Sequence, residues 1–297
     1  MRRRTALAAL ALPFWPRLLQ AQEVTQRFGM LTVAVETTFA QPGGIAVVRF
    51  RSRWLGGTYA IFEGRRAPVF AAAGGARALV PIPVTTPPGS GLLGIELYAR
   101  NGIQRLRMDF PIGERSFGGR AQTLPDEKRA LLQQPNPWRD GRRLLLALRT
   151  FTSEAQWKGP FRPPVVAPAL ETFGEHESYG GPPVLTMMDG GSGDQNRGLD
   201  YPLAAGTMIQ SPAAGTVVMA EPLLLTGNTV VIDHGQGLVS SLCHLSAMDV
   251  RPNDHLDART RLGMAGETGL ALFSQVHWSV YLHGIPIDPS VVIKALA

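Results

Sequence analysis

The first third of the chain alternates short apolar runs with turn residues. Runs rich in Val, Ile, Leu and Ala cover residues 31–35, 44–50, 58–62, 78–84, 92–99 and 105–110. Short strands at regular spacing, separated by Gly- and Pro-containing turns, are typical of antiparallel sandwiches. We therefore expect a mainly β protein with an N-terminal immunoglobulin-like β-sandwich over residues 22–117. This region contains no histidine and no catalytic constellation.

The pattern changes over residues 118–160. Leucine-containing segments at 125–132 and 142–148 fit helical spacing better than strand alternation. Pro125 and the acidic residues Asp126 and Glu127 stand where a helix would begin. We expect two helices in a short helical connector over residues 118–160, which serves as a spacer or a lid.

Strand-like runs return from residue 161 onward. Residues 206–220 predict two strands around the turn at 212–215, and residues 228–235 and 238–246 predict a hairpin over 235–237. The six histidines of the chain all lie in this part, at positions 176, 234, 244, 255, 277 and 283. Any histidine chemistry is therefore expected in residues 161–297.

The predicted strand at residues 273–281 carries the most informative histidine. Its odd positions from 275 to 281 are Gln, His, Ser and Tyr, and the even positions between them are Val, Trp and Val. Successive side chains of a strand point to opposite faces, so His277 belongs to a polar face whose reverse side is apolar. This arrangement predicts a site on one side of a sheet.

The N-terminus predicts export. Arg2, Arg3 and Arg4 precede an apolar stretch at residues 5–15 that is too short to cross a bilayer. We interpret residues 1–21 as a signal peptide and place the mature protein in the periplasm or cell envelope; Sec and twin-arginine export both remain open. No later run is apolar for long enough to span a membrane, so no integral span is expected after signal removal.

Composition argues against a nucleic-acid partner. The formal net charge is +6, but removing residues 1–21 lowers the basic residues from 29 to 25 against 23 acidic ones, which leaves +2. A charge this small provides no basic surface for nucleic acid. The lone cysteine, Cys243, cannot form an internal disulfide.

Several short segments together resemble one family. They are residues 196–202, 204–207, 214–217, 227–235, 243–246, 275–278 and 287–289. In order and spacing, residues 161–290 resemble the lysostaphin-like, or LytM-type, zinc metalloendopeptidases that cut peptidoglycan cross-bridges. The resemblance implies a C-terminal lysostaphin-like antiparallel β-sheet domain, a peptidase fold over residues 161–297. It also implies zinc as the cofactor.

The resemblance assigns roles to five positions. The family holds zinc with a His-x-x-x-Asp pair and the second histidine of a His-x-His strand, which matches Asp200 and His277 to metal ligands. His244 matches a catalytic histidine that acts on the water or the developing oxyanion. Asn196 replaces the first ligand histidine, and Gln275 replaces the catalytic histidine of His-x-His. Leu242 also replaces a common aromatic residue beside His244.

These replacements predict a loss of chemistry. The amide oxygen of Asn196 is a poor substitute for imidazole on zinc, and Gln275 cannot exchange a proton near neutral pH. We expect no zinc or weakly bound zinc, and an inactive protein that binds peptidoglycan or regulates a cell-wall hydrolase or division protein. The alternative is an active or weakly active zinc-dependent peptidoglycan endopeptidase with a non-standard ligand set.

Other polar residues carry weaker expectations. His176, together with Glu175 or Glu177, provides candidate substitute ligands from a loop. Strand alternation predicts that Cys243 faces away from His244, which excludes a thiol and base pair. For the three remaining histidines we expect a turn or capping role at 234, a surface position at 255 and a turn at 283.

Overall fold

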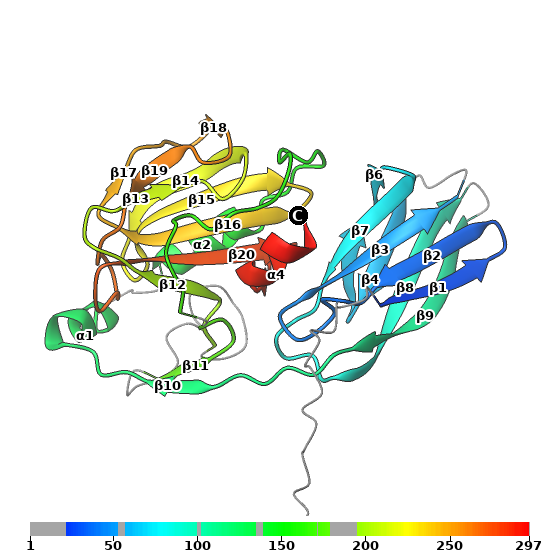
Figure 1. The fold of residues 1–297 in the computed structure, drawn as a ribbon, viewed down its shortest axis with the longest axis horizontal. Helices are drawn as coiled ribbons and strands as arrows, with labels where there is room; N and C mark the ends of the chain where they lie inside the picture. Colours follow the sequence, from blue (N-terminus) through cyan, green and yellow to red (C-terminus); the bar gives the residue numbers. More distant parts are fainter. Residues whose placement is uncertain are drawn as a thin grey trace, which may run out of the picture.

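The structure is a computed structural model that describes residues 22–52, 57–99, 102–134, 139–170, 172–178 and 195–296. Two β-rich regions lie side by side and are joined by an extended segment (Figure 1). The predicted signal peptide at residues 1–21 lies outside the described residues. Among those residues, no helix is both long and apolar enough to cross a membrane.

The N-terminal region contains two antiparallel sheets. Its strands are β1 (Glu23–Phe28), β2 (Leu31–Glu36), β3 (Ile45–Arg51), β4 (Thr58–Phe62), β5 (Arg65–Pro68), β6 (Phe70–Ala72), β7 (Gly75–Pro81), β8 (Gly89–Ala99) and β9 (Gly102–Ile112). One sheet has the order β1-β2-β3-β7-β6 and the other β5-β4-β8-β9. Val33 and Phe50 of the first sheet share a core with Leu93 and Phe110 of the second. Two layers therefore enclose one core, and the immunoglobulin-like type stays a prediction.

The six predicted N-terminal strands are present, with ends shifted by a few residues. The pattern missed β1, β5 and β6, which form at sheet edges. Their sequences are short or rich in polar residues, as in the EVTQRF of β1 and the RRAP of β5. Backbone pairing to a neighbouring strand, rather than apolar alternation, defines these edges.

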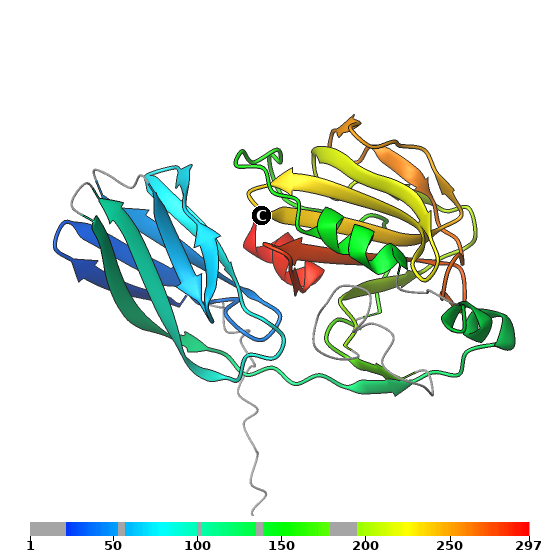
Figure 2. The same cartoon turned by 180° about the vertical axis from the view of Figure 1, so that it is seen from behind.

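The connector contains both predicted helices. It comprises β10 (Gly119–Ala121), α1 (Asp126–Leu132) and α2 (Arg139–Leu148), and it leads to β11 (His176–Ser178). In α2, Leu144 and Leu148 pack on Val231, Val239 and Tyr281 of the C-terminal sheet. Figure 2 shows α2 lying across the face of that sheet. The connector thus covers part of the C-terminal region.

The C-terminal region is built on a largely antiparallel sheet. Its elements are β12 (Gly198–Pro202), β13 (Met208–Gln210), β14 (Gly215–Leu223), β15 (Gly227–Gly235), β16 (Leu238–Leu245), β17 (Ala247–Met248), β18 (His255–Leu256), β19 (Arg261–Met264), β20 (Gln275–Leu282), β21 (Ile285–Ile287) and α4 (Pro289–Ala295). The main sheet has the order β12-β20-β16-β15-β14-β18, with β21 paired to β20. The predicted β15–β16 hairpin is present. In contrast, β13 belongs with β19 and β17 in a separate sheet.

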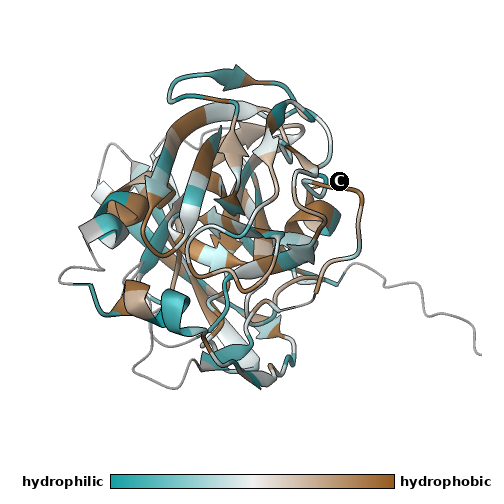
Figure 3. Cartoon of the chain, turned by 90° about the vertical axis from the view of Figure 1, so that its left-hand side faces the viewer, coloured by the Kyte–Doolittle hydropathy of each residue, from teal (hydrophilic) through white to brown (hydrophobic). Residues whose placement is uncertain are grey.

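Strand alternation in β20 is as predicted. Val276, Trp278 and Val280 are buried in the main core of the C-terminal region. His277 and its same-face neighbours line a pocket on the opposite side of the sheet. Figure 3 shows hydrophobic segments in the middle of this region and a hydrophilic segment at the top, around β18.

The two regions share buried contacts. Ile45 and Leu79 of the N-terminal sheet belong to the same apolar cluster as Val291 and Val292 of α4. The Asp288 N–H donates to the Gly43 carbonyl, and the Asp288 carboxylate pairs with Arg115. The predicted boundaries after residues 117 and 160 stay predictions.

Candidate functional site

Asp200 and His277 face each other on paired strands. Asp200 on β12 lies opposite His277 on β20, and Cys243 on β16 lies opposite His277 on its other side. Directly opposed residues of paired strands point to the same face of a sheet. This register brings a carboxylate, an imidazole and a thiol to one pocket of about 120 Å³.

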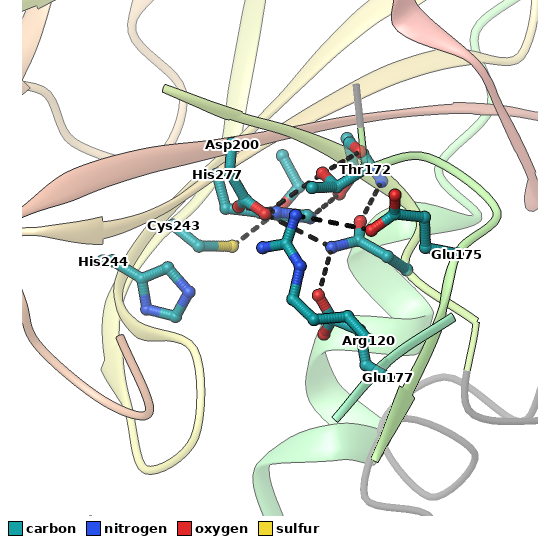
Figure 4. Close-up of polar contacts among 12 residues, drawn as sticks. Arg120, Thr172, Glu175, Glu177, Asp200, Cys243, His244 and His277 are labelled. Atoms are coloured by element: carbon teal, nitrogen blue, oxygen red, sulfur yellow. Dashed lines mark hydrogen bonds and ion pairs between the residues drawn. The ribbon is translucent and has the colours of Figure 1, made fainter. Parts of the chain in front are cut away.

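Both ring nitrogens of His277 have protein partners. Nδ1 lies 2.7 Å from Asp200 Oδ1, and Nε2 lies 2.8 Å from Ser279 Oγ (Figure 4). Burial alone would lower the pKa of His277, but the carboxylates of Asp200 and Glu177 outweigh burial and raise it. Burial would raise the pKa of Asp200, but His277 lowers it. The two shifts favour a charged pair.

Asn196 directs its amino group, not its oxygen, toward the carboxylates. Its Nδ2 donates to Glu177 Oε1 at 2.9 Å and to Asp200 Oδ2 at 3.3 Å. Its Oδ1 accepts the Gly198 N–H at 2.9 Å. Carboxylates on one side and a backbone donor on the other fix this orientation of the amide. The one atom of Asn196 able to bind a metal is therefore used by the backbone.

Of the three residues considered as substitute metal ligands, Glu177 lines the pocket. It is buried on β11 and lines the pocket, which neither His176 nor Glu175 does. From sequence alone the three residues are equivalent, because the pattern predicts a loop over them. The pairing of β11 with β10 makes this segment a strand and fixes which side chain faces inward.

The connector contributes a cation to the same pocket. Arg120 on β10 lies opposite Glu177 on β11, and its guanidinium lies 3.4 Å from Glu175 Oε2. Arg120 also lines the pocket with Asp200 and His277, and Figure 4 shows it reaching toward this cluster. The sequence gives no sign of this role, because it depends on a parallel pairing between distant segments.

Thr172 is a further residue that the sequence pattern does not reveal. Its Oγ1 lies 3.1 Å from Asp200 Oδ2, and the residue is fully buried. Together with Asn196, it supplies hydrogen-bond donors to the Asp200 oxygen that does not face His277. Both oxygens of Asp200 are thus engaged by protein groups.

The residues present do not fit a three-ligand zinc site. A catalytic zinc needs three protein donors and one open position. Throughout the described part of the chain, no group of three or more His, Cys, Asp or Glu side chains is arranged to hold a metal ion. Asp200 and His277 bond to each other, and the Asn196 oxygen points elsewhere.

A hydrogen bond to the backbone fixes the tautomer of His244. Its Nδ1 lies 2.8 Å from the Thr268 carbonyl, so Nδ1 carries the proton and Nε2 is left as the acceptor. Burial, followed by the charge of His277, lowers the pKa of His244 to about 4. The two rings stand edge to face with centroids 6.3 Å apart. His244 is therefore neutral at pH 7 and lines the pocket beside His277.

The predicted separation of Cys243 from His244 is wrong. Both residues line the pocket, because His244 has a φ of 68° and breaks the strand alternation. Burial nevertheless raises the pKa of Cys243 to about 11, and its Sγ lies 3.4 Å from Ser241 Oγ. The thiol is thus protonated at neutral pH, which argues against a nucleophilic role.

Gln275 occupies the position expected for a catalytic histidine. It is buried at the start of β20 and lines the pocket. Its Oε1 is buried without a hydrogen-bond partner among the described residues. An amide here can accept or donate hydrogen bonds but cannot serve as a general base.

The other histidines lie outside the pocket. The turn or capping role expected for His234 is wrong, because its ring is fully buried and bonds to the Ala214 carbonyl and Ser240 Oγ. His255 is exposed on β18, as expected. His283 has a φ of 52° in the turn between β20 and β21, also as expected.

Comparisons with known proteins agree with this fold. Residues 194–289 match the model of Peptidase family M23. We call this part of the chain the M23 domain, after the family model that it matches. The family is one of metallopeptidases that include lysostaphin-like enzymes, so the expected peptidase fold is confirmed at this level.

Relatives of the M23 domain include a peptidoglycan endopeptidase and a cell division protein. The chain is 29% identical over 93 residues to the peptidoglycan DD-endopeptidase ShyA of Vibrio cholerae, covering 31% of this chain and 22% of ShyA. It is 28% identical over 146 residues to the cell division protein DipM of Caulobacter vibrioides, covering 47% of this chain and 22% of DipM. The chain thus matches about a fifth of the length of each of these relatives.

A crystal structure extends the similarity beyond the M23 domain. A Pseudomonas aeruginosa protein assigned to peptidase M23 is 29% identical, with a TM-score of 0.61. The match covers 86% of this chain and 96% of that chain. The N-terminal sheets and the M23 domain therefore occur together in another protein.

Proposed function

We propose that this chain is an exported cell-envelope protein with an M23 peptidase fold that no longer cuts peptide bonds. Its pocket would bind peptidoglycan, or dock onto a wall hydrolase or division protein. The observation that carries this proposal is the hydrogen-bond network that joins Asp200 to His277 and Asn196. In this network, the side chains at the positions of the family's zinc ligands form hydrogen bonds with other protein groups.

Three features support the loss of catalysis. Asn196 presents an amino group to Asp200, so it repels a cation there instead of binding it. His277 has partners at both ring nitrogens, Asp200 and Ser279. Gln275 supplies no base to activate water. The first two features affect metal binding and the third affects the activation of water, so restoring only one would not restore activity.

The pocket retains groups suited to binding a peptide. Gln275 Oε1 lacks a partner among the described residues, and His244 Nε2 is an acceptor, so both suit the N–H groups of a bound chain. Arg120 and Arg197 add positive charge to the lining. Stem peptides of peptidoglycan combine backbone amides with carboxylates, which match this mixture of acceptors and cations.

Its relatives and N-terminus support an envelope location. ShyA is named as a peptidoglycan endopeptidase and DipM as a cell division protein. The basic and apolar residues 1–21 have the composition of a signal peptide. Export would place the pocket in the periplasm, where peptidoglycan is accessible.

One observation favours the alternative of a zinc endopeptidase with a non-standard ligand set. The Glu177 carboxylate lies next to Asn196 and lines the pocket with Asp200 and His277. Carboxylate, carboxylate and imidazole are acceptable zinc donors. This reading requires Asp200 and His277 to exchange their mutual hydrogen bond for a metal.

Metal content and wall binding would test the proposal together. Chains beginning at residue 22 would be purified with added zinc, dialysed and analysed for bound metal, and then incubated with purified peptidoglycan. We expect well below one zinc per chain, no released muropeptides, and co-sedimentation with the peptidoglycan or capture of a wall hydrolase. Stoichiometric zinc that is lost in an Asp200→Ala, His277→Ala double variant, together with cleavage, would establish the alternative.

A second pair of variants would place the binding in this pocket. Arg120→Ala removes a pocket cation whose partner, Glu175, lies outside the pocket lining. Arg251→Ala removes an exposed arginine elsewhere on the M23 domain and serves as the matched control. We expect weaker co-sedimentation or capture for Arg120→Ala alone. Equal losses in both variants would indicate non-specific charge attraction.

A further inference from the structure

A second pocket lies between the N-terminal sheets and the M23 domain. It has a volume of about 300 Å³ and is lined from one side by residues of β4, β5 and β7. Arg149, just after α2, and the turn at residues 283–285 line it from the other side. Figures 1 and 2 show these parts of the two regions facing each other. The pocket shares no lining residue with the M23 site.

The lining of this interdomain pocket is basic. Arg65, Arg66 and Arg149 line it, and none of its lining residues is acidic. Burial lowers the pKa of the fourth titratable lining residue, His283, to about 4, so that ring is neutral at pH 7. The positive charge therefore comes from the three arginines.

Nearby carboxylates neutralise only part of this charge. Arg66 lies 2.8 Å from Glu96, but Glu96 is shared with Arg105 at 3.0 Å. Arg65 lies 3.4 Å from Glu63, and the two side chains are 51% and 35% exposed, which makes this a weak pair. Glu63 and Glu96 thus carry two negative charges against the three positive charges of their arginine partners, and a positive excess remains at the pocket.

Arg149 carries a charge that has no counter-ion among the described residues. Its guanidinium makes no hydrogen bond or ion pair with them, although its backbone N–H donates to the Leu146 carbonyl. Its stem packs on Gly284, where an added Cβ would lie 2.9 Å from Arg149 Cγ. Gly284 has a φ of 77°, so the turn and the missing side chain together allow this close approach. The stem is held in place while the charged end is available.

We infer that this interdomain pocket binds an oxyanion, a phosphate or a carboxylate, carried on a compact organic body about the size of one sugar ring. Guanidinium groups bind both anions through paired N–H donors. The apolar residues Ala67, Val80 and Ile285 between the arginines suit the carbon skeleton of such a ligand. A bound ligand contacts both regions and holds them together.

Calorimetric titration of the chain beginning at residue 22 tests this inference. The probes are glucose 6-phosphate, glucuronate, inorganic phosphate and glucose, at low ionic strength. We expect one equivalent of glucose 6-phosphate or glucuronate to bind, with weaker binding of inorganic phosphate and none of glucose. Failure of both acidic sugars to bind would overturn the assignment. Inorganic phosphate binding as tightly as they do would overturn the organic part of the ligand.

Variants on opposite walls locate the site. Arg149→Ala and Arg65→Ala remove exposed arginines, one from each region, and each should weaken binding by about tenfold. Arg251→Ala removes an exposed arginine away from the pocket and should leave binding unchanged. Unaltered thermal unfolding in the absence of ligand confirms that each variant folds. Unchanged affinity in Arg149→Ala, or an equal loss in Arg251→Ala, would overturn the inference, whatever the M23 pocket binds.

Discussion

Asp200 and His277 lie opposite each other on β12 and β20 and share a hydrogen bond of 2.7 Å between Oδ1 and Nδ1. In a zinc site of the type that the resemblance implies, both side chains would bind the metal. Here each stabilises the charge of the other. The two strands therefore hold a buried polar centre, and its behaviour can be tested by mutation.

Histidines introduced at positions 196 and 275 should create a zinc site. Asn196→His replaces an amide that presents its amino group to Asp200, and Gln275→His returns a base to the pocket. We expect about one zinc per chain in the double variant, measured by metal analysis after dialysis. Gln275→His alone adds no ligand and serves as the control. A double variant without zinc would show that the loss extends beyond these two positions.

Removing Asp200 should destabilise the fold. Asp200→Ala leaves His277 buried without its main partner and breaks the bonds from Thr172 and Asn196. Breaking a buried pair from one side costs about 3–5 kcal/mol. Asp249→Ala, which breaks the half-exposed pair with Arg261, should change the free energy of unfolding by less than about 1 kcal/mol. Denaturant titration measures both, and equal effects would contradict the assigned role of Asp200.

The buried His234 should make stability depend on pH. Burial lowers its pKa to about 4, while in the unfolded chain it titrates near its ordinary value of 6.5. The unfolded state therefore takes up a proton first, so this contribution to stability is complete above pH 6.5 and is lost as pH falls from 6.5 to 4. Between pH 7 and pH 5 the loss is on the order of 2 kcal/mol.

A His234→Gln variant isolates this effect. Other histidines also titrate in this range, and the raised pKa of His277 acts in the opposite direction. The informative quantity is therefore the difference between the pH slopes of the original chain and the variant in denaturant titrations. A variant with an unchanged slope would show that folding does not lower the pKa of His234.

Cys243 should be unreactive in the folded protein. Its thiol is buried, and burial raises its pKa to about 11. A thiol reagent at pH 8 should modify almost none of it until guanidinium chloride unfolds the chain, and then about one equivalent per chain. Rapid modification without denaturant would reopen a thiol role beside His244.

Local sequence was enough to predict the centre of the site but not its surroundings. The alternation in β20 identified the face of His277, because strand parity depends only on neighbouring residues. The roles of Glu177 and Arg120 depend on the pairing of β11 with β10, which joins segments far apart in the chain. His244 breaks the strand alternation because its φ is positive, which the local sequence does not predict. The resemblance supplied residue roles, whereas the orientation of the Asn196 amide required coordinates.

The buried cluster that joins β3 and β7 to α4 couples the unfolding of the two regions. Because Ile45 and Leu79 share a core with Val291 and Val292, residues of the N-terminal region complete the main core of the C-terminal region. Heating should therefore give one cooperative transition instead of two. A chain truncated to begin after residue 117 would expose the apolar side of α4 and the Asp288 carboxylate, and it should aggregate or melt at a lower temperature than the longer chain.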